Sequence, residues 1–92
     1  MITRNELEKL IFPYRQKDVI IFGTDRVMKL IKNGKIEKVI IANNAPEKTR
    51  KDLEYYSKLS GFEVIEVDLN NMELGTFFRK QYGISVVGII KS

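Results

Sequence analysis

Three short segments of this chain carry side chains that could hold an anion or contact a nucleobase. They are residues 23–26, Gly-Thr-Asp-Arg, residues 43–46, Asn-Asn-Ala-Pro, and residues 79–83, Arg-Lys-Gln-Tyr-Gly. Free backbone amides at a helix start, together with lysine and arginine, bind phosphate oxygens. Asparagine can hydrogen-bond a base edge, and a tyrosine ring can stack on an unpaired base. The three segments form one site only if the fold brings them together.

The N-terminal region is predicted to be a helix that ends early. Thr3 and Glu6 form a capping box, in which each side chain meets an unpaired amide at the helix start. Pro13 should stop or kink the helix near Phe12. The helix has an apolar stripe at the spacing i, i+3, i+4, i+7: Leu7, Leu10, Ile11 and Tyr14.

Four apolar segments predict four strands. The continuous runs at 19–22 and 39–42 favour buried strands. Residues 62–67 alternate only partly between apolar and polar side chains, which predicts a third strand with one wetter face. Residues 84–90 form the fourth apolar run.

Helices are predicted between these strands. A second helix follows residues 23–25 and ends at Asn33-Gly34. A third helix starts with Asn44 as its cap, Pro46 in its first turn and an acidic residue next, and it runs to about Ser60 before Gly61. A short fourth helix is capped by Asn70 or Asn71, and its inward-facing residues are Leu74, Phe77 and Phe78.

The element order α-β-α-β-α-β-α-β predicts an α/β fold with helices on both faces of a mostly parallel sheet. Ligands in such sheets gather at the carboxyl ends of parallel strands, where residues 23–26 and 43–46 lie. The fourth helix is about eight residues and ~12 Å long. A helix this short need not cross the sheet, so the last strand could run parallel or antiparallel to the others. If that strand runs antiparallel, residues 79–83 reach the same rim.

Composition limits the chemistry available to this chain. It has 92 residues, which predicts one domain over residues 1–92, and it contains no histidine and no cysteine. The commonest general base and the commonest metal ligands are therefore missing, and we expect no catalytic site, cofactor or metal. No apolar run approaches ~18 residues, and the first residues do not resemble a signal peptide. These features predict a cytoplasmic protein without membrane contact.

The charges are unevenly distributed along the chain. The net charge is +4, and residues 26–38 hold five basic side chains against one glutamate, whereas residues 62–74 hold four acidic and no basic side chains. A basic stripe suits a polyanion, because phosphates attract lysine and arginine and release counterions. The alternative is a solvated, lysine-rich helix.

Four sequence blocks, in this order and spacing, resemble a known family. They are residues 40–46, 52–61, 73–76 and 82–90, or IIANNAP, DLEYYSKLSG, ELGT and YGISVVGII. The chain resembles the archaeal and eukaryotic large-subunit ribosomal protein family numbered thirty, within the kink-turn RNA-binding superfamily. The resemblance implies a three-layer α/β/α sandwich with a mixed four-stranded sheet, and a partner in structured RNA, chiefly ribosomal RNA, beside other ribonucleoprotein components.

The resemblance also assigns roles to particular residues. Gly23 matches the glycine that begins the first RNA-contact loop, and Lys29 matches a lysine one helical turn further on. Asn44 matches the family's asparagine, and Tyr82 matches the aromatic residue that stacks on a base. The block at residues 73–76 is expected to be structural, behind that last loop. The complete predicted RNA-binding set is Gly23, Thr24, Asp25, Arg26, Lys29, Asn43, Asn44, Lys80, Tyr82 and Gly83.

The chain departs from the family at two places. Asp25 stands where a lysine or arginine is usual, and it is followed by Arg26. Asp25 would repel a phosphate but could accept a proton from a guanine amino group. Arg79 replaces a glycine that is common after the fourth helix.

Each candidate residue also has a plain structural interpretation. Gly23 fits a tight strand-to-helix turn, Asn44 a helix cap and Tyr82 a half-buried loop aromatic. Arg79 and Lys80 fit the end of a helix, where cations oppose the helix dipole. The adjacent tyrosines 55 and 56 are expected to pack along the third helix, although sequence neighbours cannot both face the core.

The leading functional hypothesis is a ribosomal-type protein that clamps a kinked internal loop of RNA, monomeric in isolation. A kink-turn protein of another ribonucleoprotein particle, such as a guide-RNA particle, is the nearest alternative. A small α/β domain that binds a phosphorylated small molecule at the same rim is a third, and a ligand-free interaction module is a fourth. Only the first two predict salt-dependent affinity for kinked RNA.

Overall fold

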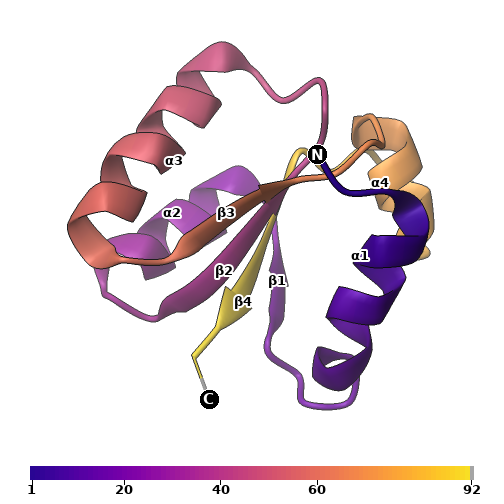
Figure 1. Ribbon diagram of the computed structural model, residues 1–92, viewed down its shortest axis with the longest axis horizontal. Coiled ribbons are helices and arrows are strands. Elements are labelled where there is room, and N and C mark those ends of the chain that lie inside the picture. Colours follow the sequence, from indigo (N-terminus) through magenta and orange to yellow (C-terminus); the bar gives the residue numbers. More distant parts are fainter. Residues whose placement is uncertain (92) are drawn as a thin grey trace.

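The computed structural model describes residues 1–91, in which four α-helices alternate with four β-strands (Figure 1). The α/β order predicted from the sequence is confirmed. A single turn of 3-10 helix, Phe12–Tyr14, follows the first α-helix, as the proline there predicts. The elements are α1 (Arg4–Ile11), β1 (Ile20–Phe22), α2 (Thr24–Lys32), β2 (Ile36–Ile41), α3 (Glu47–Ser60), β3 (Glu63–Glu66), α4 (Asn71–Phe77) and β4 (Val86–Ile90).

The four strands form one mixed sheet in the order β1-β4-β2-β3. β4 lies between β1 and β2 and is antiparallel to both, while β2 and β3 are parallel. The last strand therefore runs antiparallel. β1 and β2 then point in the same direction, so their carboxyl ends and the start of β4 share one edge of the sheet.

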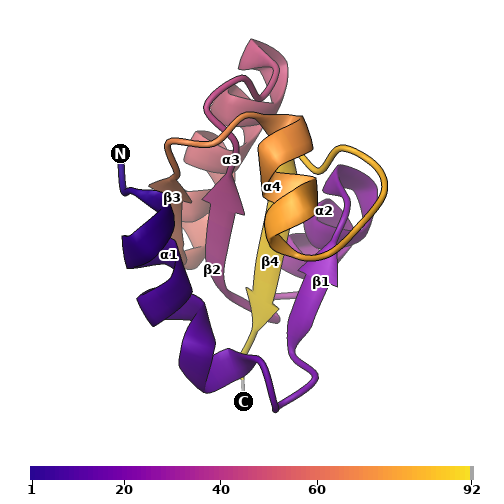
Figure 2. The same cartoon turned by 90° about the vertical axis from the view of Figure 1, so that its right-hand side faces the viewer.

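Helices cover both faces of the sheet, which makes three layers (Figures 1 and 2). α1 and α4 cover one face, and α2 and α3 cover the other. Alternate residues of β2 point to opposite sides: Ile40 joins the cluster beneath α1 and α4, whereas Val39 and Ile41 join the cluster beneath α2 and α3. Each helix contributes fully buried side chains to these two clusters, such as Leu7 and Leu74 to the first and Val27 and Leu53 to the second.

Local signals define several helix ends. The Thr3–Glu6 capping box is present, and Asn70 forms a second capping box with Glu73 at the start of α4. Gly61 ends α3 in the left-handed conformation, with φ 76°. These contacts lie within a few residues of one another along the chain, which is why the sequence predicts them well.

The structure differs from the expected strands and helix surface at three places. β1 is only half-buried, not fully buried, because it lies at the edge of the sheet beside β4 alone. β2 begins at Ile36, earlier than the apolar run that predicted it. Tyr55 does not pack against the core, since 61% of it is exposed, whereas Tyr56 is partly buried against the cluster beneath α2 and α3.

Candidate functional site

The loops that follow β1 and β2 flank the start of β4. The Gly23 amide donates to the Val86 carbonyl at 3.2 Å, and the Ala42 amide donates to the Ser85 carbonyl at 3.0 Å. In Figure 2 the loop from α4 to β4 lies at the same end of the sheet. The structure thus brings the three polar segments to one rim.

An open hollow of ≈ 290 Å³ lies at this rim. Six of the ten predicted RNA-binding residues line it: Gly23, Thr24, Arg26, Lys80, Tyr82 and Gly83. Asp25, Lys29, Asn43 and Asn44 lie outside it. Their placement tests proximity only, so the RNA-binding role of all ten residues stays a prediction.

The start of α2 presents backbone amides to this hollow. Gly23 is the N-cap and adopts φ 102°, a conformation that glycine tolerates far better than residues with a Cβ atom. It has no side chain that could cap the helix, so the first-turn amides keep their donors for a ligand. The same turn carries exposed Asp25 and exposed Arg26, which places both signs of charge beside those amides.

A cation and an aromatic ring come from the loop between α4 and β4. The Lys80 Nζ lies 4.8 Å from the centroid of the Phe22 ring, a cation–π contact between two residues that both line the hollow. Tyr82 is 57% exposed. The expectation of a half-buried loop tyrosine is wrong, and its ring is accessible for stacking.

The close fit of this loop against α4 depends on Gly75. A Cβ atom at this position would overlap the Tyr82 carbonyl oxygen and would lie 3.2 Å from the Tyr82 carbonyl carbon. Gly75 is therefore the residue that lets the backbone of the Tyr82 loop rest on the helix. The expectation that residues 73–76 have a structural role agrees with this contact.

Asn44 does not cap α3, contrary to the sequence-based interpretation. The N-cap is Pro46, and no side chain caps this helix start. Instead, Asn44 Oδ1 accepts from the Asn71 amide at 2.9 Å, and Asn44 Nδ2 donates to Asn71 Oδ1 at 3.0 Å. Asn44 thus ties the loop after β2 to the start of α4, where the Asn71 carbonyl accepts from the Ile84 amide at 2.9 Å.

The backbone amide and the backbone carbonyl of Asn43 both form hydrogen bonds within the protein. Its amide donates to the Leu69 carbonyl at 2.8 Å, and its carbonyl accepts from Arg50 Nη2 at 2.7 Å. Its side-chain Nδ2 lies 3.4 Å from Asp68 Oδ1. These contacts assign Asn43 to holding the loop, whereas the exposed Asn44 lies nearer to the loop that carries Tyr82.

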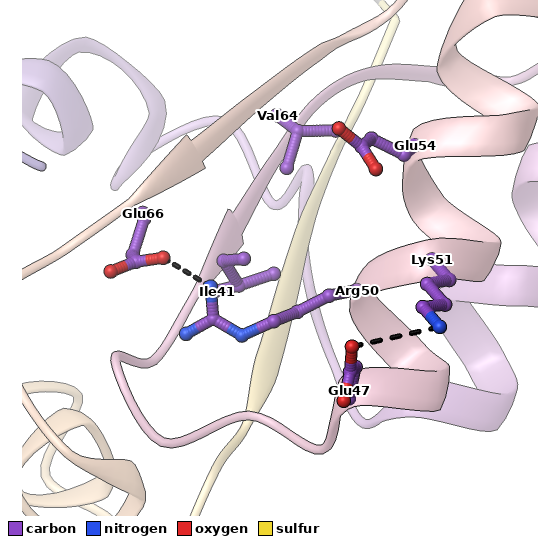
Figure 3. Close-up of a pocket in the computed structure, with 7 residues that line it drawn as sticks. All are labelled: Ile41, Glu47, Arg50, Lys51, Glu54, Val64 and Glu66. Atoms are coloured by element: carbon purple, nitrogen blue, oxygen red, sulfur yellow. Dashed lines mark hydrogen bonds and ion pairs between the residues drawn. The ribbon is translucent and has the colours of Figure 1, made fainter.

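Arg50 is a residue that the sequence analysis missed. Its guanidinium reaches from α3 under the loop after β2 and pairs with Glu66 of β3 (Figure 3). It also donates to the Ala45 carbonyl at 3.2 Å through Nε, in addition to its bond to Asn43. An arginine is suited to this position because its fork of donors can satisfy several acceptors at once.

The basic stripe of residues 26–38 divides into exposed and engaged cations. Arg26 and Lys29 are exposed on α2; Arg26 lies in its first turn and lines the rim hollow, whereas Lys29 lies in its last turn and does not line it. Lys38 lies farther along, in β2, where the hydrogen bond that it donates to the Glu63 carboxylate at 3.1 Å raises its pKa. Lys32 Nζ lies 6.0 Å from the Tyr56 ring centroid. From this stripe, Arg26 is therefore the cation that lines the rim hollow, together with Lys80 from the loop before β4.

Arg79 adopts the left-handed conformation that a glycine would favour. Its φ is 62°, and the turn has the hydrogen bonds of a Schellman motif: Arg79 N to Thr76 O and Lys80 N to Gly75 O, each 2.9 Å. The replacement of a common family glycine thus occurs at a position where the backbone still has glycine-like geometry.

Within residues 1–91, no cluster of three or more His, Cys, Asp or Glu side chains has the arrangement needed to hold a metal ion. Among the helices of the described chain, none is long and apolar enough to cross a membrane.

Known proteins resemble this chain over most of its length. A large ribosomal subunit protein eL30 from Aeropyrum pernix is 31% identical over 84 residues, which cover 91% of this chain and 84% of that protein. The eL30 protein of Sulfurisphaera tokodaii is 34% identical over 71 residues, covering 77% of this chain and 67% of that protein.

Solved structures share the fold. A Giardia lamblia 15.5 kD RNA-binding protein has a TM-score of 0.79 at 25% identity, covering 96% of this chain and 73% of that chain. A Bacillus halodurans protein of unknown function has a TM-score of 0.72 at 25% identity, covering 84% of this chain and 76% of that chain. The model of the ribosomal protein L7Ae/L30e/S12e/Gadd45 family matches residues 5–92, and this chain belongs to that family.

Proposed function

We propose that this chain is an RNA-binding protein of the large-ribosomal-subunit type, which acts as a single domain and performs no catalysis. Its partner is a kink-turn, an internal loop of RNA that bends sharply, within ribosomal RNA, among other ribosomal components in the cytoplasm. The observation that carries the proposal is the shared hollow at the rim, where the start of α2 meets Lys80 and Tyr82.

The chemistry of the rim suits a bent RNA backbone with displaced bases. The first-turn amides of α2, with Arg26 and Lys29, would contact phosphates where the two strands crowd together. Tyr82, with its exposed ring, would stack on a base turned out of the helix. Asn44 would present its amide to a base edge next to that stack.

The deciding experiment measures binding of a kink-turn RNA and of a plain duplex at several salt concentrations. The wild-type chain should prefer the kink-turn, and its affinity should fall as salt rises, with a slope of about −0.7 to −0.9 per phosphate contacted. Tyr82→Ala should weaken kink-turn binding by ~1–3 kcal/mol, the usual contribution of one base–aromatic stack. Equal affinity for both RNAs would overturn the proposal.

Lys29→Gln separates phosphate contact from base contact. It should flatten the salt slope for the kink-turn by about one contact and leave the preference over the duplex intact. Lys58→Gln, which removes the same charge from exposed α3, is the matched control and should leave the slope unchanged. A Lys29 variant with a wild-type slope would remove this residue from the interface.

A kink-turn protein of another ribonucleoprotein particle is the second candidate, supported by the structural likeness to the Giardia lamblia 15.5 kD RNA-binding protein. Sequencing of the RNA that co-purifies with the chain from its own cell extract distinguishes the two. Ribosomal RNA favours the first candidate, and a small guide RNA favours the second.

A further inference from the structure

Three arginines surround a second hollow, on the face formed by α1 and α4. Arg4, Arg15 and Arg79 line this hollow of ≈ 360 Å³, which shares no lining residue with the hollow at the rim. They come from the start of α1, from the segment after the 3-10 helix and from the turn after α4. We refer to this feature as the arginine hollow.

Two of these arginines are held over the same aromatic ring. The guanidinium carbon of Arg4 lies 5.5 Å from the Phe77 ring centroid, and that of Arg15 lies 5.4 Å from it. Cation–π contacts of this kind orient a guanidinium but leave its charge unneutralised. Arg15 also pairs with Glu8, so of these two guanidiniums it is that of Arg4 whose charge has no ion-pair partner within residues 1–91.

The arginine hollow contains less negative charge than positive charge. Glu8 is the acidic residue in its lining, and its carboxylate pairs with Arg15 at 2.8 Å. Within residues 1–91, Arg4 and Arg79 form no ion pair. Phe12, 71% exposed, adds an apolar surface to the same lining. The arginine donors of this lining suit the phosphate oxygens of a nucleic-acid backbone.

Shared residues connect the arginine hollow to the rim. Arg15 also lines a hollow of ≈ 250 Å³ together with Phe22 and Lys80, and those two residues line the rim hollow as well. Asp18 also lines this connecting hollow and would repel a phosphate, so we expect the phosphate contacts to be made by the cations Arg15 and Lys80. The longest dimension of the molecule is 30 Å, comparable to one turn of a nucleic-acid double helix.

We infer that the arginine hollow is a second phosphate-binding site, which holds the backbone of the RNA stem that leaves the kink bound at the rim. α1, α4 and the loop that carries Lys80 face the same side of the molecule, the side toward the viewer in Figure 2. One stem can therefore follow this face from Lys80 to Arg4. The inference rests on the proposed RNA-binding function and adds the part of the RNA that this face recognises.

The test uses the full chain and two kink-turn RNAs, one with a stem of a full helical turn and one with that stem cut to a few base pairs. The double variant Arg4→Gln, Arg79→Gln should flatten the salt slope for the long stem by about two contacts. It should leave the slope for the short stem unchanged. Lys51→Gln with Lys58→Gln, on α3 across the sheet, removes the same charge and should change neither slope.

The melting temperature of every variant is measured to check that it is folded. If the double variant is unfolded, the single variants Arg4→Gln and Arg79→Gln are used instead, and each should flatten the salt slope for the long stem by about one contact. A wild-type slope on the long stem overturns the second site while kink-turn binding stands. If the wild-type chain does not prefer the kink-turn, the proposed function fails, and slopes on a plain duplex decide the second site. Binding of neither RNA overturns both.

Discussion

The two loops that meet at the rim are held in different ways. The loop after β2, residues 42–46, is fixed by polar contacts from three parts of the chain. Arg50 binds its carbonyls from α3, Leu69 accepts from the Asn43 amide, and Asn71 pairs with Asn44 at the start of α4. This loop is therefore positioned before any ligand arrives.

The loop before β4, residues 79–85, is held mainly at its ends. Its first two amides belong to the turn that ends α4, and the Ile84 amide donates to Asn71. In the described chain the amides of residues 81–83 make no hydrogen bond to another backbone group. The middle of this loop is supported by steric contact with α4 at Gly75, and Tyr82 projects into solvent.

Under the proposed function, this difference separates two roles. A polar loop that is already ordered would offer Asn44 to RNA at little entropic cost, whereas the exposed Tyr82 would be ordered by the base on which it is proposed to stack. Substitutions that release the first loop should lower both stability and RNA affinity. Substitutions at the exposed tip of the second loop should lower affinity alone, unless they disturb its support at Gly75.

Gly75→Ala should have the largest effect on stability and affinity, because it disrupts the close contact between α4 and the loop before β4. The new methyl group overlaps the Tyr82 carbonyl, and relief of that overlap requires the loop or the helix to move. Overpacking of this kind costs about 1–3 kcal/mol in the free energy of unfolding, measurable by urea denaturation. Kink-turn affinity should fall with it, because Tyr82 is displaced.

Thr76→Ala is the control for that substitution, since Thr76 is exposed and next in sequence. It should change stability by no more than about 0.5 kcal/mol. If Gly75→Ala were as mild as Thr76→Ala, the loop would not depend on close contact with α4, and the contrast between the two loops would lose its structural basis.

Arg50→Met tests the first loop. The methionine keeps much of the apolar stem but leaves the Asn43 and Ala45 carbonyls without their side-chain donor, which costs about 1–3 kcal/mol in stability. Arg50 does not face the rim hollow, so any loss of RNA affinity must arise through the position of Asn44.

Lys51→Met provides the comparison for Arg50. Its side chain is 72% exposed and pairs with Glu47 across one helical turn, an interaction worth only a few tenths of a kcal/mol. A melting temperature and an RNA affinity near wild type are expected for this variant. Equal losses in the two variants would mean that Arg50 acts as an ordinary surface cation.

Asn44→Asp should have a smaller effect on stability and a larger one on binding. The aspartate can still accept from the Asn71 amide, and its charge is favourable at the start of α4, by about 0.3–1 kcal/mol. It cannot donate to Asn71 Oδ1, a loss of about 1 kcal/mol. These effects nearly cancel, whereas the negative charge at the rim should reduce RNA affinity by ~1–3 kcal/mol.

The melting temperature and the RNA affinity of Asn44→Asp, measured on the same preparation, distinguish a structural role of Asn44 from a role in RNA binding. A strong loss of stability would show that the Nδ2 donor matters more to the fold than the geometry suggests. Unchanged affinity at unchanged stability would exclude Asn44 from the RNA interface and leave it as a tie between two loops.

Local sequence patterns predicted the helices and strands, but they did not predict the contacts between residues that are far apart in the sequence. The capping box at Thr3 and the terminal Gly61 involve neighbours in sequence, and periodicity located the helices. The Asn44 side chain was misassigned because Asn-Ala-Pro is a good local helix start, while its real partner, Asn71, is 27 residues away. No local pattern reveals such a partner.

Arg50 shows the same limit at the candidate site. In α3 it stands among lysines and glutamates, and its composition there is that of a solvated helix. Its role arises because the carbonyl groups of the loop after β2 lie against the guanidinium, beside Glu66 of the neighbouring strand. The direction of β4 likewise followed from family resemblance and not from periodicity, because a short α4 permits either direction.

Arg79→Gly should produce the smallest change, and in the opposite direction. A non-glycine residue at φ 62° carries a strain of roughly 1–2 kcal/mol, which glycine relieves. Glycine also gains freedom in the unfolded chain, which offsets about 0.4–1 kcal/mol of that relief. The net expectation is a slight rise in melting temperature with the Schellman turn intact.

Arg79→Asn separates the backbone from the charge, because asparagine tolerates the left-handed region better than arginine and also removes the cation. Both variants should melt at or slightly above the wild-type temperature, and both should flatten the salt slope for a long RNA stem by about one contact if the arginine hollow binds its backbone. A fall in melting temperature for both variants would mean that the Arg79 side chain stabilises the turn by more than the left-handed backbone conformation destabilises it. The second loop would then be held by a side chain as well, as the first loop is by Arg50.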